Sequence, residues 1–125
     1  MTDWRADELA AIGGAEEIQI APDGGDGARG RAATIWVVRV GDKLYVRPYR
    51  GSLAKWYRRA IRSRRGTVLT SHLLQRVRFD DAETDMQTQI DHAYRTKYAA
   101  QSSSHVQRMV GPAAIATTLR LQPID

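Results

Sequence analysis

Cysteine is absent from the 125-residue sequence, which excludes disulfide bonds and thiolate metal sites and fits a reducing compartment. The three histidines, His72, His92 and His105, are scattered and show no paired ligand spacing, so we expect no protein metal site. No apolar run approaches the roughly 20 residues that span a bilayer, and the N-terminus lacks a basic segment followed by an apolar one. We therefore expect a cytoplasmic protein with no membrane partner.

Carboxylates are scarce in the middle of the chain, an asymmetry that the net charge of +5 hides. Residues 1–26 carry one arginine against seven acids, residues 27–79 carry fourteen basic residues against one aspartate, and residues 80–125 carry four against six. Such a basic block is typical of proteins that bind nucleic acid or another polyanion. Arginine outnumbers lysine sixteen to three, which favours bidentate recognition of phosphate or carboxylate, with biased coding composition as the competing cause.

The segment from Gly51 to Gly66 predicts one short amphipathic helix. Ser52 is a suitable N-cap, and Gly66 suits the left-handed position that follows a helix. The two faces separate cations from apolar residues, with Lys55, Arg58, Arg59 and Arg62 on one side and Leu53, Trp56, Tyr57, Ala60 and Ile61 on the other. Three of these cations lie in the early turns, where the helix dipole opposes positive charge, so an anionic partner is expected.

The rest of the chain predicts a mixed fold in one domain covering residues 1–125, since this length suffices for one core and not for two. Strand-like patterns recur at residues 17–20, 34–40, 43–47, 67–70, 73–79 and 117–122. Gly41-Asp42 predicts a tight hairpin turn. Helical spacing occurs at residues 4–12, 81–98 and 106–110, the first being a brace or lid. We expect an α+β fold: a mostly antiparallel, barrel-like sheet of about six strands with two larger helices and a short one.

No catalytic motif is visible, because no nucleophile stands beside a base and no carboxylates are recognisably paired. If the protein is an enzyme, a cofactor carries the hard step and the protein holds that cofactor in place. Two alternatives stay open at this point. The basic middle can bind nucleic acid through phosphate contacts, with Trp56 or Tyr57 stacking on bases, or the sheet and helices can bury a homodimer interface.

Four strings, IWVVRVGDKLYVR, WYRRA, IDHAYRTKY and ATTLRLQP, resemble an uncharacterised bacterial domain family over nearly the whole chain from Trp4 onward. More distantly, the chain resembles the deazaflavin-dependent nitroreductase family, which has the flavin-binding split-barrel fold. That family shows a glycine-rich basic loop before a strand, a His-Pro-x-Trp-Tyr-x-Asn-Leu helix and tyrosines in a late helix. Here Trp56 and Tyr57 match the helix motif, whereas Leu53-Ala54 replace His-Pro and Arg59 falls where Asn is usual.

The resemblance implies a split β-barrel that holds a phosphate-bearing cofactor, a deazaflavin before FMN, in an oxidoreductase acting on an electron-poor small molecule. By position it implies the cofactor-binding residues Arg29, Arg31, Thr34, Arg47, Arg50, Ser52, Trp56, Arg58, Arg59, Tyr94 and Tyr98. It implies no catalytic residue, because the protein orients a hydride-bearing ring with little acid–base help. The alternatives are a cofactor-free, homodimeric interaction module and, less favoured, nucleic-acid binding through residues 27–79.

Overall fold

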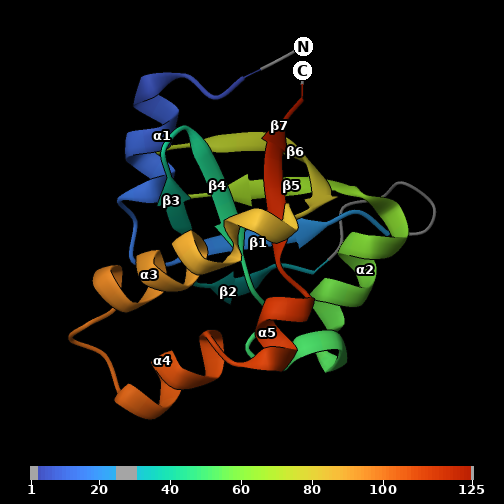
Figure 1. The fold of residues 1–125 in the computed structure, drawn as a ribbon. Coiled ribbons are helices and arrows are strands. Elements are labelled where there is room, and N and C mark those ends of the chain that lie inside the picture. The colour runs from blue at the N-terminus through green and yellow to red at the C-terminus, as the bar shows by residue number, and fades with distance from the viewer. Residues whose placement is uncertain (1–2, 25–30, 125) are drawn as a thin grey trace.

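One curled antiparallel sheet forms the framework of the protein. The structure is a computed structural model that describes residues 3–24 and 31–124. Its strands are β1 (Ile18–Pro22), β2 (Ala33–Ile35), β3 (Val38–Val40), β4 (Lys43–Val46), β5 (Arg65–Leu69), β6 (Leu74–Asp81) and β7 (Leu119–Pro123). The strand order is β2-β1-β5-β6-β7-β4-β3, and every neighbouring pair is antiparallel. The sheet curls into a half-barrel (Figure 1), which confirms the expected α+β split-barrel class.

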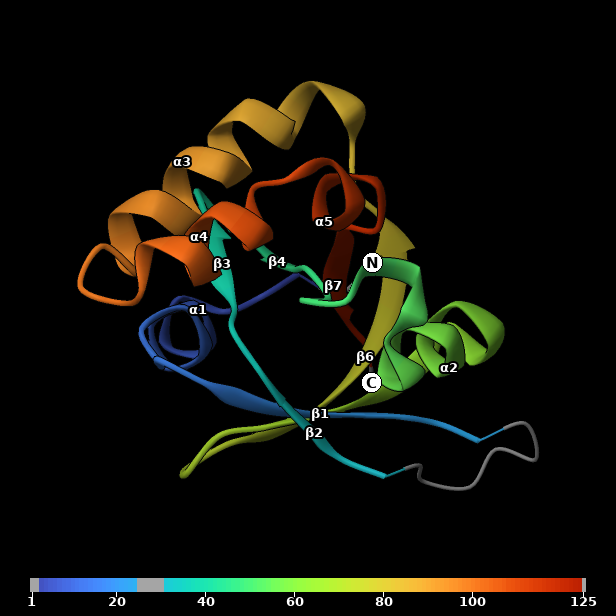
Figure 2. The ribbon, with the colours of Figure 1, turned by 90° about the horizontal axis from the view of Figure 1, so that it is seen from below.

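Helices surround the half-barrel on several sides (Figures 1 and 2). The α-helices are α1 (Ala6–Gly13), α2 (Lys55–Ser63), α3 (Gln87–Lys97), α4 (Ser103–Met109) and α5 (Pro112–Ala116), and the 3-10 turns are η1 (Gly51–Leu53) and η2 (Thr84–Met86). Helix α1 contacts β3 and β4, α2 contacts β1 and β5, and α3 contacts β3 and α4. Within the part of the chain that the structure describes, no helix is both long and apolar enough to cross a membrane.

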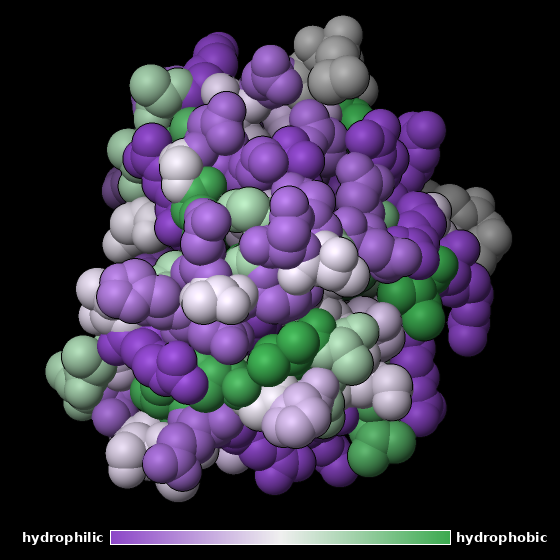
Figure 3. All heavy atoms as spheres, viewed as in Figure 1, coloured by the Kyte–Doolittle hydropathy of each residue, from purple (hydrophilic) through white to green (hydrophobic). Residues whose placement is uncertain are grey.

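Two clusters of buried side chains hold these layers together. The larger one fills the half-barrel with aliphatic residues from six of the strands and from α1 and α2, and Trp4, Trp56 and Tyr57 pack against it. The smaller one lies between β3, β4, α3 and α4 and includes Trp36 and Tyr94. On the face shown in Figure 3, a hydrophobic strip lies between α3 above and α4 and α5 below, whereas hydrophilic residues cover most of the remaining surface.

Residues 34–40, predicted as one strand, form two strands at opposite ends of the sheet. Strand β2 ends at Ile35 and pairs with β1, whereas β3 begins at Val38 and pairs with β4. Figure 2 shows the chain running from β2 to β3 across the molecule. The single-strand prediction is wrong because Trp36 and Val37 leave the ladder, and the backbone of Val37 finds its partners in side chains.

The end of α3 supplies those partners. The Tyr98 hydroxyl accepts a hydrogen bond from the Val37 N–H at 3.1 Å and lies within donating distance of the carbonyls of Glu16 (2.7 Å) and Val37 (3.1 Å). The Lys97 ammonium donates to the Val37 carbonyl at 2.6 Å and to the Ala15 carbonyl at 2.5 Å. Because Val37 is fully buried, these two side chains replace the strand partners that its peptide groups would otherwise lack.

The expected helix from Gly51 to Gly66 is shorter than predicted and begins later. Residues 51–53 form η1, and α2 starts after Ala54, which makes no side-chain capping bond, so the expectation that Ser52 caps the helix is wrong. The left-handed residue after the helix is Arg64, with φ of 61°, whereas Gly66 lies in β5. The Arg64 guanidinium donates to the Phe79 carbonyl at 3.2 Å, which ties this turn to β6.

Gly66 serves close packing. A Cβ atom at this position would lie 2.7 Å from the Ala21 carbonyl oxygen, 2.8 Å from the Pro22 Cα and 2.9 Å from the Phe79 ring. Two of these three neighbours are backbone atoms of β1, which cannot turn aside as the end of a flexible side chain can. Glycine therefore lets β1 and Phe79 close over β5.

The other predicted elements agree with the structure within a few residues. The first helix, expected over residues 4–12, is α1, and the helix expected over 81–98 is preceded by an extension of β6 to Asp81 and by η2. Gly41 takes a positive φ of 63° in the predicted hairpin turn. Strand β7 inserts between β6 and β4, and it thereby joins the two halves of the sheet.

Replacing Tyr98 with phenylalanine should lower the free energy of unfolding by about 1–3 kcal/mol, because the buried Val37 N–H loses its partner. The matched control is Tyr94→Phe. The Tyr94 hydroxyl is also buried, but it has no hydrogen-bond partner among the described residues, so its removal should change stability by less than about 0.5 kcal/mol. Urea unfolding of both variants measures the difference, and equal losses would contradict the assignment.

Replacing Gly66 with alanine should destabilise the protein by about 1–3 kcal/mol through overpacking. Gly41→Asn is the control, because nothing lies within 4 Å of a Cβ atom there and asparagine tolerates a left-handed backbone. Thermal melts of the two variants test this difference. A Gly66→Ala variant that melts with the wild type would show that β1 has room to move.

Candidate functional site

One hollow gathers several of the residues that the sequence singled out. We call it the Trp56 hollow; it has a volume of about 470 Å³, and its lining includes Thr34, Trp36, Arg50, Lys55, Trp56 and His105. These residues come from β2, from the bend after it, from the segment between β4 and η1, from the start of α2 and from α4.

Aromatic rings form one wall of the Trp56 hollow. The Trp36 indole is stacked between two rings, with the Tyr98 ring centroid 3.8 Å away at 4° and the His105 ring centroid 4.3 Å away at 14°. Tyr49 meets His105 edge-on at 4.4 Å. Both faces of Trp36 are therefore covered by other rings. Trp56, on α2, is half-buried and also lines the hollow.

Two cations of the hollow have no acidic partner. Arg50 and Lys55 are exposed, and neither forms an ion pair with any residue in the described ranges. Glu17 is the one acidic residue among the described residues that line the hollow. The hollow thus combines an apolar and aromatic wall with positive charge at its mouth, which is the arrangement that an aromatic anion needs.

Arg47 also lines the Trp56 hollow, but its guanidinium is almost fully engaged inside the protein. Its Nε donates to Thr118 Oγ1 at 2.9 Å, its Nη1 donates to Asp91 Oδ1 at 2.5 Å and to the Met109 carbonyl at 3.0 Å, and its Nη2 donates to Gln87 Oε1 at 2.6 Å. These bonds use four of the five N–H groups that an arginine offers. Arg47, which is only 1% exposed, therefore ties the end of β4 to α3, to α4 and to the residue before β7, and its role is structural.

The structure brings some of the predicted cofactor-binding residues together and separates others. Thr34, Arg47, Arg50 and Trp56 line the Trp56 hollow. Six others are described but do not line it: Arg31, Ser52, Arg58, Arg59, Tyr94 and Tyr98. Arg58 lies nearby, where its Nε donates to the Ser52 carbonyl at 3.0 Å. The last of the eleven, Arg29, lies outside the described residues.

Tyr94 and Tyr98 are both buried, and their contacts mainly stabilise the fold. Tyr94 is fully buried 5.4 Å below the Arg47 guanidinium, and burial raises the pKa of its hydroxyl. Burial also raises the pKa of Tyr98, to about 12, although the hydrogen bond with the Val37 backbone opposes this shift. Both phenols are therefore neutral at physiological pH. Tyr98 still influences the hollow, because its ring supports Trp36 from behind.

Sequence reasoning missed His105 and Trp36 as members of this site. His105 sits on α4, and no local pattern shows that α4 folds back so that this ring stacks on Trp36. Trp36 lies in a run that is rich in β-branched residues, and the backbone bend at Val37 turns it toward the hollow. No group of three His, Asp or Glu side chains in residues 3–24 and 31–124 is arranged to hold a metal ion.

Solved structures with the same fold include three proteins with cofactors in their names. An F420 reductase superposes with a TM-score of 0.58 at 14% identity, covering 94% of this chain and 93% of that chain. HutZ, a heme storage protein from Vibrio cholerae, gives a TM-score of 0.64 at 10% identity and coverages of 96% and 90%. A FAD-binding protein from Mesorhizobium loti gives 0.56 at 15% identity and coverages of 99% and 93%. At these identities the likeness establishes the fold alone.

The sequence comparisons identify a protein family but no activity. No curated protein matches the chain. One family model matches residues 8–121, which is nearly the whole domain. The chain therefore belongs to the bacterial family described as "Uncharacterized protein conserved in bacteria (DUF2255)".

Proposed function

We propose that the protein binds a phosphate-bearing flavin-type cofactor, a deazaflavin in preference to FMN, in the Trp56 hollow, and that it serves as an oxidoreductase on an electron-poor small molecule. The main support for this proposal is that one hollow contains both an aromatic wall and two cations without an acidic partner among the described residues, Arg50 and Lys55. The shared fold with an F420 reductase and a FAD-binding protein supports the same class of ligand.

The charges of the hollow fit the anionic end of such a cofactor. Phosphate and carboxylate groups take charge-assisted hydrogen bonds from arginine and lysine. Arg50 presents its guanidinium at the mouth without an internal carboxylate to compete for it, and Lys55 stands at the first turn of α2. The Glu17 carboxylate would repel an anion, so the anionic groups of the cofactor would lie away from it, toward η1 and α2.

The size and walls of the hollow fit a planar ring. A volume of about 470 Å³ lies within the range of roughly 300–1,000 Å³ that small-molecule sites occupy. Because Trp36 is already stacked on both faces, a bound ring would meet its edge and would face Trp56 instead. Thr34 and Arg47 also line the hollow. The Thr34 hydroxyl already accepts a hydrogen bond from Gln19 Nε2 at 2.6 Å, so the ring would contact Thr34 mainly through its methyl group.

The chain's own residues would bind and orient the cofactor. When bound, a flavin or deazaflavin supplies hydride transfer. Arg50 and Lys55 would hold its anionic groups, and the Trp56 and Trp36 side chains would exclude water from one side of the ring. No acid–base residue is required of the protein for this task.

Haem is the second candidate ligand, and one residue favours it. His105 lines the same hollow, and imidazole is a common axial ligand of haem iron. A heme storage protein shares the fold. Haem would require the His105 ring to leave its stack on Trp36 or to bind iron from that position, and a Soret band that His105→Ala abolishes would identify it.

A thermal-shift panel of oxidised and reduced deazaflavin, FMN, FAD, nicotinamide nucleotides and haemin tests the proposal. A ligand at 100 times its Kd stabilises the folded state by roughly 2.7 kcal/mol, which is a melting shift of several degrees for a domain of this size. Deazaflavin should give the largest shift. Arg50→Glu and Lys55→Glu should each abolish it, because both place a carboxylate beside the cofactor's anionic groups.

Arg62→Glu is the matched control, since Arg62 lies on the same helix, is exposed and does not line the hollow. It should retain the cofactor-induced shift measured against its own unliganded melting point. The proposal fails if no cofactor raises the melting point by as much as a degree, or if the Arg50 and Lys55 variants bind as well as the control. An interaction module without a small ligand would then be the better interpretation.

A further inference from the structure

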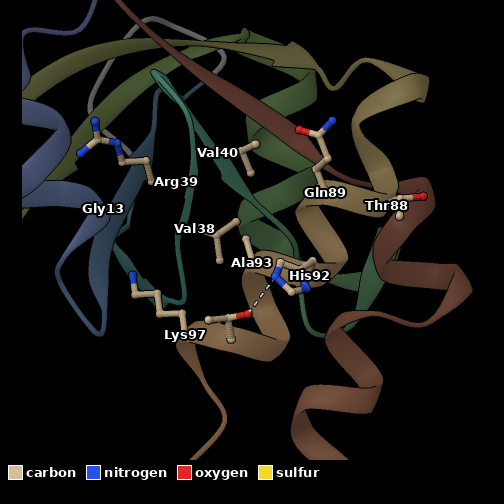
Figure 4. A pocket seen from close by; sticks show the side chains of 10 residues that line it. Gly13, Val38, Arg39, Val40, Thr88, Gln89, His92, Ala93 and Lys97 are labelled. Carbon is tan, nitrogen blue, oxygen red and sulfur yellow. Dashed lines mark hydrogen bonds between the residues drawn. The ribbon is translucent and has the colours of Figure 1, made fainter.

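A second hollow lies on the other side of the Trp36–Val38 bend. We call it the Lys97 hollow; its volume is about 760 Å³, and it lies between the end of α1, strand β3 and helix α3 (Figure 4). Val38, Val40 and Ala93 give it apolar walls. Its lining shares no residue with that of the Trp56 hollow.

Lys97 brings a cation to this hollow in addition to its structural role at the Val37 bend. Its ammonium donates to two backbone carbonyls, those of Ala15 and Val37, and this leaves one of its three N–H groups. It forms no ion pair within the described part of the chain. Burial lowers the pKa of Lys97 to about 8, whereas the Glu16 carboxylate acts in the opposite direction. A half-buried charge that burial disfavours gains stability from any anion that enters beside it.

Arg39 brings a second cation to the same hollow. Its Nε donates to the Gly41 carbonyl at 2.7 Å, and its guanidinium has no acidic partner among residues 3–24 and 31–124. Gly13 makes room for it, because a Cβ atom on Gly13 would lie 2.9 Å from the Arg39 Cβ. Figure 4 shows Arg39 and Lys97 on the same side of the hollow.

The opposite side of the hollow is polar and carries no negative charge. Thr88, Gln89, His92 and Thr96 line it from α3, and the Thr96 hydroxyl lies 3.4 Å from His92 Nε2. No acidic residue lines the hollow among the described residues. The site therefore joins apolar walls to two uncompensated cations, a combination that matches a ligand with an apolar body and one anionic head.

We infer that the Lys97 hollow binds an amphipathic carboxylate, with its carboxylate at Lys97, on the side of the hollow that also carries Arg39, and its apolar body against Val38, Val40 and Ala93. Carboxylate is the head that this arrangement suits, because it can accept a bond from the remaining Lys97 N–H while the positive charge of Arg39 favours an anion on the same side. This site is independent of the proposed cofactor site, since none of the residues that define it contributes to the Trp56 hollow.

Isothermal titration with decanoate tests the inference, and decyltrimethylammonium of equal chain length serves as the opposite-charge control. The wild-type chain should bind one decanoate and should bind the cation at least about tenfold more weakly. Lys97→Met and Arg39→Gln should each weaken decanoate binding about tenfold. Ala93→Phe should abolish binding by filling the hollow without touching either cation.

Matched variants distinguish binding in this hollow from a general effect of surface charge and from binding in the Trp56 hollow. Arg95→Gln removes an exposed cation from α3 that does not line the hollow, and it should bind decanoate like the wild type. Arg50→Glu should also bind normally, which shows that the probe does not occupy the Trp56 hollow. Arg39→Gln and Ala93→Phe keep the test decisive if Lys97→Met fails to fold, because neither residue holds the Val37 carbonyl.

Three results would overturn the inference. The first is decanoate binding that is unchanged in both Arg39→Gln and Ala93→Phe. The second is equal binding of decanoate and decyltrimethylammonium, which would show a purely apolar surface. The third is concentration-dependent dimerisation that Ala93→Phe or Arg39→Gln disrupts while decanoate has no effect, because the hollow would then be covered by a second copy of the chain.

Discussion

The peptide groups of Val37 are the point on which the arrangement of the molecule depends. The chain must cross from β2 at one end of the sheet to β3 at the other, and at the crossing the Val37 N–H and carbonyl leave the strand ladder inside the protein. Tyr98 and Lys97 supply the missing hydrogen-bond partners from the end of α3. An unpaired buried peptide group would cost about 1–3 kcal/mol, so these two side chains fix both the bend and the position of α3. The bend in turn separates the two hollows, with Trp36 facing one and Val38 facing the other.

In the folded protein, the basic residues between positions 27 and 79 form two groups. Five of these cations form ion pairs, all with acids from residues 1–26 or 80–125: Lys43, Arg47, Arg64, Arg76 and Arg78. Others have no acidic partner among the described residues, and three of these, Arg39, Arg50 and Lys55, line a hollow. The excess of positive charge is therefore partly engaged in ion pairs that stabilise the fold, and part of it lines the two hollows. Trp56 packs partly against the core and also lines the Trp56 hollow.

Local patterns predicted those parts of the fold that local interactions determine. The hairpin at Gly41, the pairing of β5 with β6 and the final strand follow from alternation and turn chemistry. The bend at Val37 could not be predicted, because TIWVVRV is uniformly suited to a strand and the side chains that break it lie 60 or so residues away. The same holds for the site: Arg50 and Trp56 follow from the resemblance to a known family, whereas His105 enters through the packing of α4.

Native-state hydrogen exchange at the Val37 amide tests the role of this peptide most directly. Because the Val37 amide donates to the Tyr98 hydroxyl, it should exchange only through large-scale unfolding in the wild type, as we also expect of the amides of β5 and β6. In the Tyr98→Phe variant it should exchange through local opening, while the amides of β5 and β6 keep exchanging through global unfolding. A Val37 amide that exchanges rapidly in the wild type, or one whose protection Tyr98→Phe leaves unchanged, would contradict this account.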